Sequence, residues 1–346
     1  MRGVDVIVPM KYLVTGPGGF LGRHIVEKLL ARGDSVRGFA RHSQPELEAH
    51  GMEMRLGDLA DESAVLDACN GVDAVFHVAA IAGIGANWNR YYLTNVVGTE
   101  NILNGCLKSN VSRMVYTSSP SVVFTNYSLE NVDESTPYPK SFNAHYPRSK
   151  AMAEQKTLSF NGRQTVDGQT LSTCALRPHL IWGPGDHNLI PRLIQRAKAG
   201  ILRRVGEGKN LVDTTYVENA ADGHIAAMDA LLSGTKSIPA GKAYFLSQDD
   251  PVNCWGWIDQ LLDIYHLPPV KKAMSFSAAY AIGAVYDLIW SLIGREADPP
   301  MSKFLAIQLS VSNYFNISAA KRDFGYNPKI SNDEGMKRMA EEADKK

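Results

Sequence analysis

A glycine-rich turn separates two hydrophobic patterns of different period near the start of the chain. The apolar run Lys11–Thr15 predicts a short strand, and Ile25, Leu29 and Leu30 recur at helical spacing. Three glycines stand between the two segments: Gly16, Gly19 and Gly22. This spacing allows a tight turn, close approach of the backbone to a pyrophosphate at the helix N-terminus, and close packing of helix on strand. A glycine-rich turn that binds no ligand has the same pattern, so the surrounding sequence must decide between the two interpretations.

Strand and helix patterns continue to alternate through the first half of the chain. Further strands are predicted at Ser35–Ala40, Ala74–Ala79, Arg113–Ser118 and Ser172–Arg177, and helices at Ala64–Cys69, Asn95–Leu107 and from about Pro147. Regular alternation is typical of parallel β-α-β crossovers. We therefore expect an α/β fold with a doubly wound parallel sheet, a Rossmann arrangement, which is the context that a dinucleotide-binding glycine turn requires.

The composition and the pattern of the sequence change after Gly183-Pro-Gly185. Aromatic, glycine and proline residues become more frequent, and strict alternation is lost. We expect a dinucleotide-binding domain formed by residues 10–185 and 212–248. A smaller, discontinuous C-terminal lobe formed by residues 186–211 and 249–330 is expected to bind the substrate.

Composition excludes several classes of protein. With 346 residues, 45% of them apolar and 21% charged, the chain can bury a substantial core. Lys plus Arg and Asp plus Glu are equal at 36 each, so no overall positive field favours nucleic acid as a partner. The cysteines form no C-x-x-C pair and the histidines no H-E-x-x-H pair. We expect neither a metal site nor a disulfide framework.

The segment before the first strand is short and only partly apolar. It lacks the length of a signal-peptide core, and no small-residue cleavage site follows, which predicts a cytoplasmic protein. Met10 directly precedes the first strand, so translation could begin there. Residues 1–9 would then be a dispensable extension.

A second apolar segment, Ala273–Ile293, has about the length of a membrane span. Asp287 and three serines interrupt it, and we therefore reject a span. Two interpretations remain open. The segment is either an ordinary buried pair of helices or an apolar lid over the substrate that also touches lipid.

The end of the second predicted strand discriminates between the two nicotinamide cofactors. In NAD enzymes a carboxylate at this place binds the ribose hydroxyls, but this chain has Ala40 followed by Arg41. A guanidinium offers a forked, charged partner to the 2′-phosphate of NADP, so NADPH is favoured over NADH. The alternative for Arg41 is a solvated loop residue. Asp58, in a later turn, could accept from the adenine amino group, and its alternative is a turn or N-cap aspartate.

A tyrosine and a lysine four residues apart supply a candidate acid–base pair. Tyr146 and Lys150 lie on one face of the predicted helix. A nearby ammonium lowers the pKa of a phenol, which is ordinarily about 10. Ser119 follows a strand end, the edge where ligands bind in such sheets, and could donate to a substrate carbonyl. Alone, each feature would be more typical of a surface pair or a Ser/Thr-rich turn.

These motifs occur in one order with several others. The series is Gly16-x-x-Gly19-x-x-Gly22, Asp58-Leu59, His77-Val-Ala-Ala80, Asn95-Val-Val-Gly-Thr99, Tyr116-Thr-Ser-Ser119, Tyr146-x-x-x-Lys150, Arg177-Pro178, Gly183-Pro-Gly-Asp186, Thr215-Tyr-Val-Glu-Asn-Ala-Ala-Asp222 and Phe324-Gly-Tyr-x-Pro328. The motifs and their order resemble those of the extended short-chain dehydrogenases/reductases over nearly the whole length of the chain. Among these proteins the chain is similar to the 3β-hydroxysteroid dehydrogenase branch. Residues 175–186, 212–216 and 299–304 are similar to bacterial 2-alkyl-3-oxoalkanoate reductases of long-chain olefin biosynthesis.

The resemblance implies roles for single residues. Ser119, Tyr146 and Lys150 would be the catalytic three. Asn95 would hold a water molecule, with a helix N-cap as its alternative. His77 is expected to be a packed histidine near the cofactor groove. The expected cofactor-binding residues are Gly16, Gly19, Phe20, Leu21, Gly22, Arg41, Asp58, Leu59, Ala79, Tyr146, Lys150 and Pro178.

The implied reaction is the NADPH-dependent reduction of a 2-alkyl-3-oxoalkanoate to the 2-alkyl-3-hydroxyalkanoate, with Tyr146 as proton donor. Residues 183–186 are expected to border the nicotinamide. The residues after Asp186, together with Ala273–Ile293, are expected to hold the long alkyl chains. Peripheral contact with a membrane or a partner enzyme, and a homo-oligomer, are left open.

Three alternatives accompany this reading. An NAD(P)-dependent 3β-hydroxysteroid or sterol-4-carboxylate 3-dehydrogenase shares the catalytic set, although Ala40 and Arg41 depart from the NAD pattern of the steroid enzymes. A sugar-nucleotide epimerase or dehydratase is more distant. A non-catalytic NADP-binding sensor belongs to another class, and such sensors commonly lack the Tyr/Lys pair that is present here.

Overall fold

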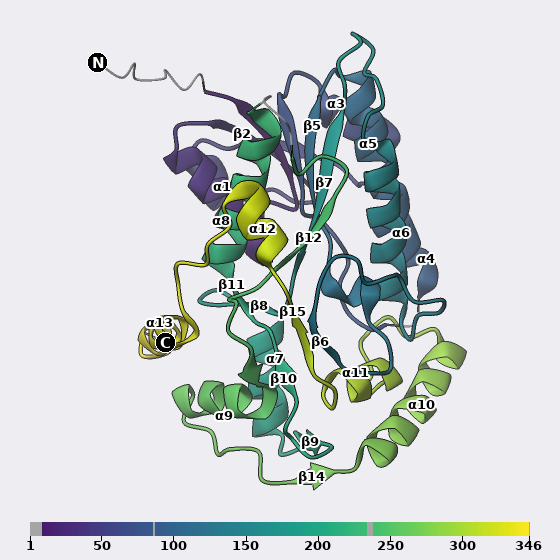
Figure 1. Cartoon of the computed structure of the whole chain (residues 1–346), viewed down its shortest axis with the longest axis vertical. Helices are drawn as coiled ribbons and strands as arrows, with labels where there is room; N and C mark the ends of the chain where they lie inside the picture. Colours follow the sequence, from purple (N-terminus) through teal and green to yellow (C-terminus); the bar gives the residue numbers. More distant parts are fainter. Residues whose placement is uncertain (1–8, 86, 234–237, 346) are drawn as a thin grey trace.

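The computed structural model describes residues 9–85, 87–233 and 238–345. Residues 1–8, part of the expected N-terminal extension, lie outside the described residues. The largest element is a seven-stranded parallel sheet of order β12-β7-β5-β4-β1-β2-β3 (Figure 1). Its strands are β1 (Lys11–Thr15), β2 (Ser35–Ala40), β3 (Glu53–Leu56), β4 (Ala74–His77), β5 (Arg113–Thr117), β7 (Ser172–Pro178) and β12 (Ala243–Leu246). The chain order reverses between β1 and β4, which confirms the predicted doubly wound sheet.

Successive residues of the central strand β1 enter separate hydrophobic cores on the two faces of the sheet. Tyr12 and Val14 pack in one core and Leu13 in the other, and all three are buried. Helices cover both faces (Figure 1). On one face lie α1 (Phe20–Ala31) and α8 (Val217–Leu232), and on the other α3 (Glu62–Cys69), α5 (Gly98–Lys108) and α6 (His145–Phe160).

Parts of this sheet and its connections differ from expectation. The sequence does not predict β3 or the short helix α2 (Pro45–Ala49). β3 is a half-buried edge strand with two charged residues among its four, so it lacks the apolar run that marks the interior strands. The single helix expected from Asn95 is instead a succession of α4 (Trp88–Tyr91), a π-helical stretch η1 (Tyr92–Val97) and α5.

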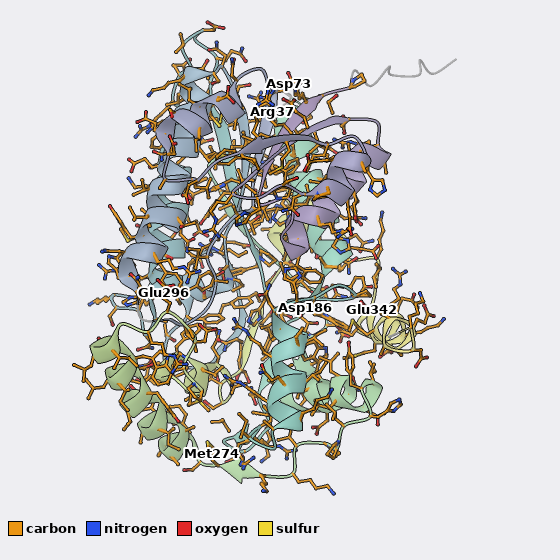
Figure 2. The ribbon with its side chains drawn as sticks, turned by 180° about the vertical axis from the view of Figure 1, so that it is seen from behind. Arg37, Asp73, Asp186, Met274, Glu296 and Glu342 are labelled. Carbon is orange, nitrogen blue, oxygen red and sulfur yellow. The ribbon has the colours of Figure 1, made fainter. Side chains whose placement is uncertain are left out.

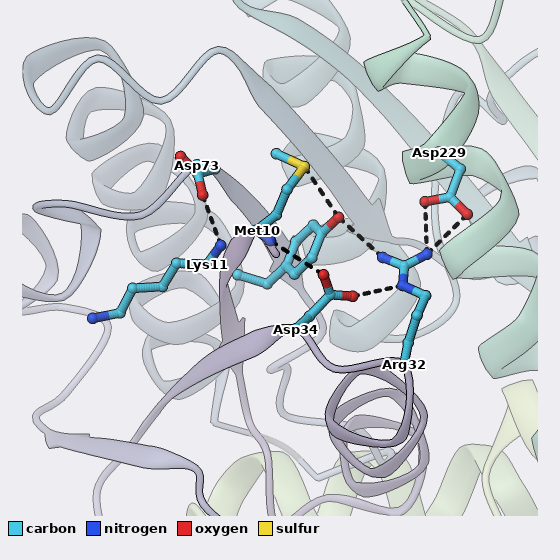
Figure 3. A network of polar contacts seen from close by, with 7 residues as sticks. Met10, Lys11, Arg32, Asp34, Asp73 and Asp229 are labelled. Carbon is cyan, nitrogen blue, oxygen red and sulfur yellow. Dashed lines mark hydrogen bonds and ion pairs between the residues drawn. The ribbon is translucent and has the colours of Figure 1, made fainter. Parts of the chain in front are cut away.

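A polar network holds the start of β1 in place (Figure 3). Arg32, which follows α1, donates to the carboxylate of Asp34 at 2.5 Å and to that of Asp229 on α8 at 2.9 Å. Asp34 also accepts from the Met10 backbone N–H at 3.2 Å. The network joins β1, α1 and α8, so the glycine turn at the other end of β1 rests on a fixed strand.

The smaller part of the molecule is built around a four-stranded sheet of order β13-β10-β15-β6. Its strands are β13 (Val252–Asn253), β10 (Leu211–Val212), β15 (Asn313–Phe315) and β6 (Leu129–Val132), and two-stranded pairs are formed by β8 (Ile181–Trp182) with β11 (Thr215–Tyr216) and by β9 (Arg204–Val205) with β14 (Ala273–Met274). Its helices are α7 (Leu189–Lys198), α9 (Cys254–Ile264), α10 (Phe276–Ile293), α11 (Lys303–Gln308) and α13 (Asn332–Ala343).

The chain passes between the two parts more often than the expected domain boundaries provide. β6 belongs to the small sheet although it lies within residues 10–185. Conversely, α12 (Ser318–Phe324) packs against α8 and β12 of the large sheet, although it lies within residues 249–330. The division into domains at the expected boundaries stays a prediction.

Helix α10 is a single helix at one side of the smaller part (Figure 1). Of its described residues, Ala279 and Gly283 are buried. Its exposed large apolar side chains are Phe276, Ile282, Val285, Leu288, Ile289, Leu292 and Ile293. The buried pair of helices considered from the sequence is therefore wrong. By length and composition α10 could cross a membrane, while its contact with lipid or a partner protein, like the cytoplasmic location, stays a prediction.

Candidate active site

A cavity of about 600 Å³ lies at the carboxyl ends of β1 and β4, where the strand order reverses. Ligands bind at this place in doubly wound sheets. Every residue that the sequence analysis assigned to cofactor binding lines this cavity, from Gly16 in the first turn to Pro178 at the end of β7. Ser119 lines it as well.

The glycine turn leaves room for a phosphate group at the start of α1. Gly16 has a φ of +67°, and a Cβ at Gly22 would lie 2.1 Å from the Gly16 carbonyl oxygen. Among the described residues no side chain caps the N-terminus of α1, and the first turn of the helix holds no acidic residue. The free N–H groups and the positive end of the helix dipole suit a pyrophosphate. The turn therefore fits a dinucleotide.

The ends of β2 and β3 border the same cavity. Ala40 and Arg41 line it, and the exposed Arg41 guanidinium has no hydrogen-bond partner in the described part of the chain. Asp58 also lines it, and its Oδ1 accepts from the Ala60 N–H at 2.9 Å. The N-cap of α3 is Asp61. Asp58 is thus a turn aspartate that borders the cavity, and its contact with an adenine stays a prediction.

Ser119, Tyr146 and Lys150 lie together where the end of β5 meets α6. The Ser119 hydroxyl is hydrogen-bonded to the Tyr146 phenol. Lys150, one turn after Tyr146, donates from Nζ to the Thr117 carbonyl oxygen at 2.5 Å. Its ammonium also lies 4.2 Å from the ring centre of Tyr116. The phenol and the ammonium are therefore both held beside one strand end.

Burial controls the protonation of both groups. It lowers the pKa of Lys150 to about 7, against the opposing effect of the Glu154 carboxylate. It raises the pKa of Tyr146, and the hydrogen bond with Ser119 opposes this rise without cancelling it. The sequence led us to expect that Lys150 lowers the pKa of Tyr146. In this structure the pKa of Tyr146 is raised instead, because burial of the phenol outweighs its hydrogen bond with Ser119. Tyr146 therefore keeps its proton at neutral pH.

Asn95 is buried and stands behind the site. Its amide donates to the Ile81 carbonyl oxygen at 3.0 Å and to the Ser149 hydroxyl at 2.9 Å, and accepts from the Ile81 N–H at 2.8 Å. Asn95 lies inside η1, so it is not the N-cap that we considered. It is absent from the described residues that line the cavity. These contacts tie the loop after β4 to α6, and a water-holding role stays a prediction.

His77 is buried between two threonines. Its ring nitrogens lie 2.8 Å from the Thr15 hydroxyl and 2.9 Å from the Thr99 hydroxyl. Burial lowers the pKa of His77 to about 3, and the charge of Lys150 acts in the same direction. The ring is neutral at physiological pH and joins β1, β4 and α5. This is the packed histidine that the sequence analysis expected.

A second cavity, of about 610 Å³, adjoins the first. Ser119, Tyr146 and Pro178 line both cavities, so the phenol stands where the two meet. The apolar walls of the second cavity come mainly from α7, α9 and α11, through Leu189, Leu193, Trp257, Ile258, Phe304 and Leu305. A bulky apolar molecule with its reactive group at Tyr146 fits this arrangement.

Asp186 stands at the start of α7, close to Glu342 on α13 (Figure 2). Its Oδ2 accepts from the Ile190 N–H at 2.9 Å and so caps the helix, while Glu342 accepts from the Gly185 N–H at 3.2 Å. Within residues 183–186, Asp186 lines the cavity at the glycine turn and the other three do not. The expected contact of residues 183–186 with the nicotinamide stays a prediction.

The place of α10 corrects the prediction for Ala273–Ile293. None of the described residues of α10 lines the apolar cavity. α11 supplies that wall instead, and α10 packs against α11 from outside. A Cβ at Gly283 would come within 2.4 Å of the Ser302 backbone, which shows how closely α10 approaches the start of α11. The expectation that α10 holds the alkyl chains is therefore wrong for this structure.

Residues 13–273 match the model of the 3-beta hydroxysteroid dehydrogenase/isomerase family. The chain belongs to this family. It is 45% identical to the 2-alkyl-3-oxoalkanoate reductase of Stenotrophomonas maltophilia, covering 95% of this chain and 98% of the relative. It is 44% identical to the enzyme of the same name in Shewanella oneidensis, covering 94% and 84%. The decarboxylating sterol-4-alpha-carboxylate 3-dehydrogenase of Mus musculus is 30% identical, with 97% and 92% covered.

The solved structures agree with the fold. A short-chain dehydrogenase/reductase superfamily protein from Agrobacterium tumefaciens with bound NAD superposes with a TM-score of 0.73 at 21% identity, covering 97% of both chains. Membership of the 3-beta hydroxysteroid dehydrogenase/isomerase family confirms the resemblance that the motifs indicated, and the chain is an oxidoreductase.

Sequence reasoning missed the charged residues of the apolar cavity of this dehydrogenase: Arg192, Arg196 and Asp298. The helical spacing of Leu189, Arg192, Leu193 and Arg196 could have placed both arginines on one face of a helix. Nothing in that spacing tells which cavity the face lines, because this depends on how α7 packs on elements far along the chain.

Proposed function

We propose that this protein reduces the ketone of a 2-alkyl-3-oxoalkanoate to the 2-alkyl-3-hydroxyalkanoate, with NADPH as cofactor. The observation that carries the proposal is the meeting of two cavities at Ser119 and Tyr146. The cavity at the glycine turn suits a dinucleotide, and the adjoining cavity suits long alkyl chains. The names of the two bacterial relatives support the choice of substrate.

The side chains at the junction have separate tasks in this reaction. Bound NADPH supplies the hydride. Ser119 and Tyr146 hydrogen-bond the ketone oxygen, and Tyr146 donates its proton as negative charge develops there. The raised pKa of Tyr146 keeps the phenol protonated at neutral pH, which is the state that a proton donor requires. Lys150, one turn away, is the residue that would contact the ribose next to the nicotinamide.

Arg41 supports NADPH over NADH. Its guanidinium is exposed at the edge of the dinucleotide cavity and free of partners among the described residues, so it can pair with a 2′-phosphate. Ala40 stands where a carboxylate would bind the ribose hydroxyls of NAD. The absence of an acid and the presence of a base favour the same cofactor.

Turnover assays test the proposal. The purified protein is given NADPH or NADH with a 2-alkyl-3-oxoalkanoate, a 3-ketosteroid or a UDP-sugar. We expect the highest kcat/KM for the oxoalkanoate with NADPH. A higher kcat/KM for the steroid or the sugar nucleotide would reject the substrate assignment, and a higher kcat/KM with NADH would reject the cofactor assignment.

A sterol-4-carboxylate or 3β-hydroxysteroid dehydrogenase is the second candidate. The relative from Mus musculus supports it, and the apolar cavity also suits a rigid ring system. A further assay with NAD and a 3β-hydroxysteroid tests it: a kcat/KM for this oxidation higher than that for reduction of the oxoalkanoate with NADPH would establish this candidate instead.

A further inference from the structure

The side of helix α7 that lines the apolar cavity carries both apolar and charged residues. Leu189, Arg192, Leu193 and Arg196 recur at spacings that place them on one side of the helix, and all four line the cavity. Two arginines in a wall that is otherwise mainly apolar need an explanation, because a charged group in apolar surroundings is unfavourable unless it is paired.

Arg192 has its partner within the protein. Its Nη1 donates to Oδ2 of Asp298 at 2.6 Å. The other carboxylate oxygen of Asp298 accepts from the Ile84 N–H at 2.7 Å. Both oxygens of Asp298 are thus engaged, and Asp298 links α7 to the loop after β4. The charge of Arg192 is compensated.

Arg196, one turn further along α7, has no hydrogen-bond or ion-pair partner in the described part of the chain, and it is partly buried. Burial lowers the pKa of Arg196, the charge of Arg192 acts in the same direction, and the charge of Asp298 opposes both. A guanidinium nevertheless stays charged at neutral pH. The described lining of the cavity therefore has two guanidinium groups and one carboxylate, and that carboxylate is hydrogen-bonded to Arg192 and not to Arg196.

We propose that Arg196 binds the carboxylate of the substrate. This rests on the proposed function, whose substrate is a carboxylic acid, and it adds the residue that recognises the acid group. The planar guanidinium presents paired N–H groups that match the two oxygens of a carboxylate. Arg192 lines both cavities, whereas Arg196 lines the apolar one and not the cavity at the glycine turn. The anion it meets is thus the substrate's, and not a cofactor phosphate.

The position suits the connectivity of the substrate. In a 2-alkyl-3-oxoalkanoate the carbon that bears the carboxylate is bonded directly to the ketone carbon. A cation in the cavity that adjoins Tyr146 can therefore hold the acid group while the ketone reaches the phenol. The apolar walls remain available for the two alkyl chains.

The test compares a stable acid with its neutral analogue. The substrates are a 2-alkyl-3-hydroxyalkanoate and its methyl ester, oxidised with saturating NADP by the wild type and by Arg196→Gln. The ester keeps the alkyl chains and the hydroxyl and loses the charge. We expect Arg196→Gln to lower kcat/KM for the acid about 10- to 100-fold, the range of one charge-assisted contact, and to leave the ester unaffected.

Two further variants serve as references. Lys198→Gln removes a cation from the same helix, at an exposed position outside this cavity. It should leave kcat/KM unchanged for both the acid and the ester. Arg196→Lys keeps the charge without the fork and should retain part of the preference for the acid. Equal losses for acid and ester in Arg196→Gln would show a merely structural role and overturn the proposal. The proposal would also be overturned if Arg192→Gln abolished the preference for the acid over the ester while Arg196→Gln kept it.

Failure of the proposed function is a separate result, seen as no turnover of either substrate by the wild type. Binding then decides the inference by itself. Trp257 lines the same cavity, so its fluorescence reports occupancy. A long-chain fatty acid should bind Arg196→Gln about 10- to 100-fold more weakly than it binds the wild type, while the corresponding alcohol binds both alike. Equal affinity of the two proteins for the acid would overturn the proposal.

Discussion

The Lys150 ammonium donates a hydrogen bond to the Thr117 carbonyl oxygen at 2.5 Å, and this bond fixes the helix that carries Tyr146 to the end of β5. The Thr117 hydroxyl lies 2.9 Å from Nε2 of His224 on α8, so the same strand end is also held from the other face of the sheet. The hydroxyl of Ser119 follows two residues later. One strand end thus sets the place of all three candidate catalytic groups.

Lys150→Met is expected to lower kcat/KM about 10²- to 10⁴-fold and to weaken the binding of NADPH. Methionine keeps much of the length of the side chain but removes the donor to Thr117 and the group that would contact the ribose. Steady-state kinetics measure the first effect, and a fluorescence titration with NADPH measures the second. Unchanged cofactor affinity would refute the ribose contact.

Lys150 should also make the stability of the cofactor-free protein depend on pH. Its pKa is about 7 in the folded protein against an ordinary value of 10.5. Between these values the unfolded chain binds a proton that the folded protein does not, so the free energy of unfolding rises with pH. The contribution should approach about 1.4 kcal/mol per pH unit inside this window.

Denaturant unfolding at several pH values measures this contribution. The slope between pH 7 and 10.5 should be smaller in Lys150→Met than in the wild type. Lys198→Met, at an exposed position, is the matched control and should keep the wild-type slope. Identical slopes in the wild type and Lys150→Met would contradict a lowered pKa of Lys150.

Asn95→Ala should destabilise the protein by about 1 to 3 kcal/mol, because it removes the partner of the part-buried N–H and carbonyl groups of Ile81 and one of the partners of the buried Ser149 hydroxyl. Ile81 lines the dinucleotide cavity, so NADPH binding should weaken as well. The control is Asn104→Ala on α5, where the side chain makes no hydrogen bond to the described residues. Equal stabilities of the two variants would show that the contacts of Asn95 contribute nothing measurable.

The parts of the structure that the sequence predicts are those determined by local spacing. Gly16 and Gly22 predict the phosphate-binding turn because their positions relative to one strand and one helix require small residues. Tyr146 and Lys150 predict a pair because helix geometry alone brings them together. The Asp298 contact with Ile84 joins residues 214 positions apart, and no local pattern encodes it. The exposure of α10 and the place of Arg196 in the apolar cavity likewise depend on how distant elements pack.

The strand end at Ala40 and Arg41 should determine cofactor preference. Arg41→Ala should weaken the binding of NADPH by about 1.5 to 3 kcal/mol, since one charge-assisted contact is lost, and should affect the binding of NADH much less. Adding Ala40→Asp should favour NADH, because a carboxylate repels the phosphate and accepts from the free hydroxyl. The ratio of kcat/KM for NADPH and NADH is measured at one salt concentration. An unchanged ratio in the double mutant would show that this strand end does not discriminate between the 2′-phosphate of NADPH and the 2′-hydroxyl of NADH.

The central claim is that a ketone in the apolar cavity is reduced at the junction where Tyr146 stands. The most direct measurement follows deuterium from labelled NADPH into a 2-alkyl-3-oxoalkanoate, with the wild type and with Tyr146→Phe. We predict that the wild type transfers the label to the carbinol carbon of the 2-alkyl-3-hydroxyalkanoate. Tyr146→Phe should do so about 10²- to 10⁴-fold more slowly with its NADPH affinity retained. Transfer by Tyr146→Phe at the wild-type rate, or no labelled hydroxy acid from the wild type, would contradict the account.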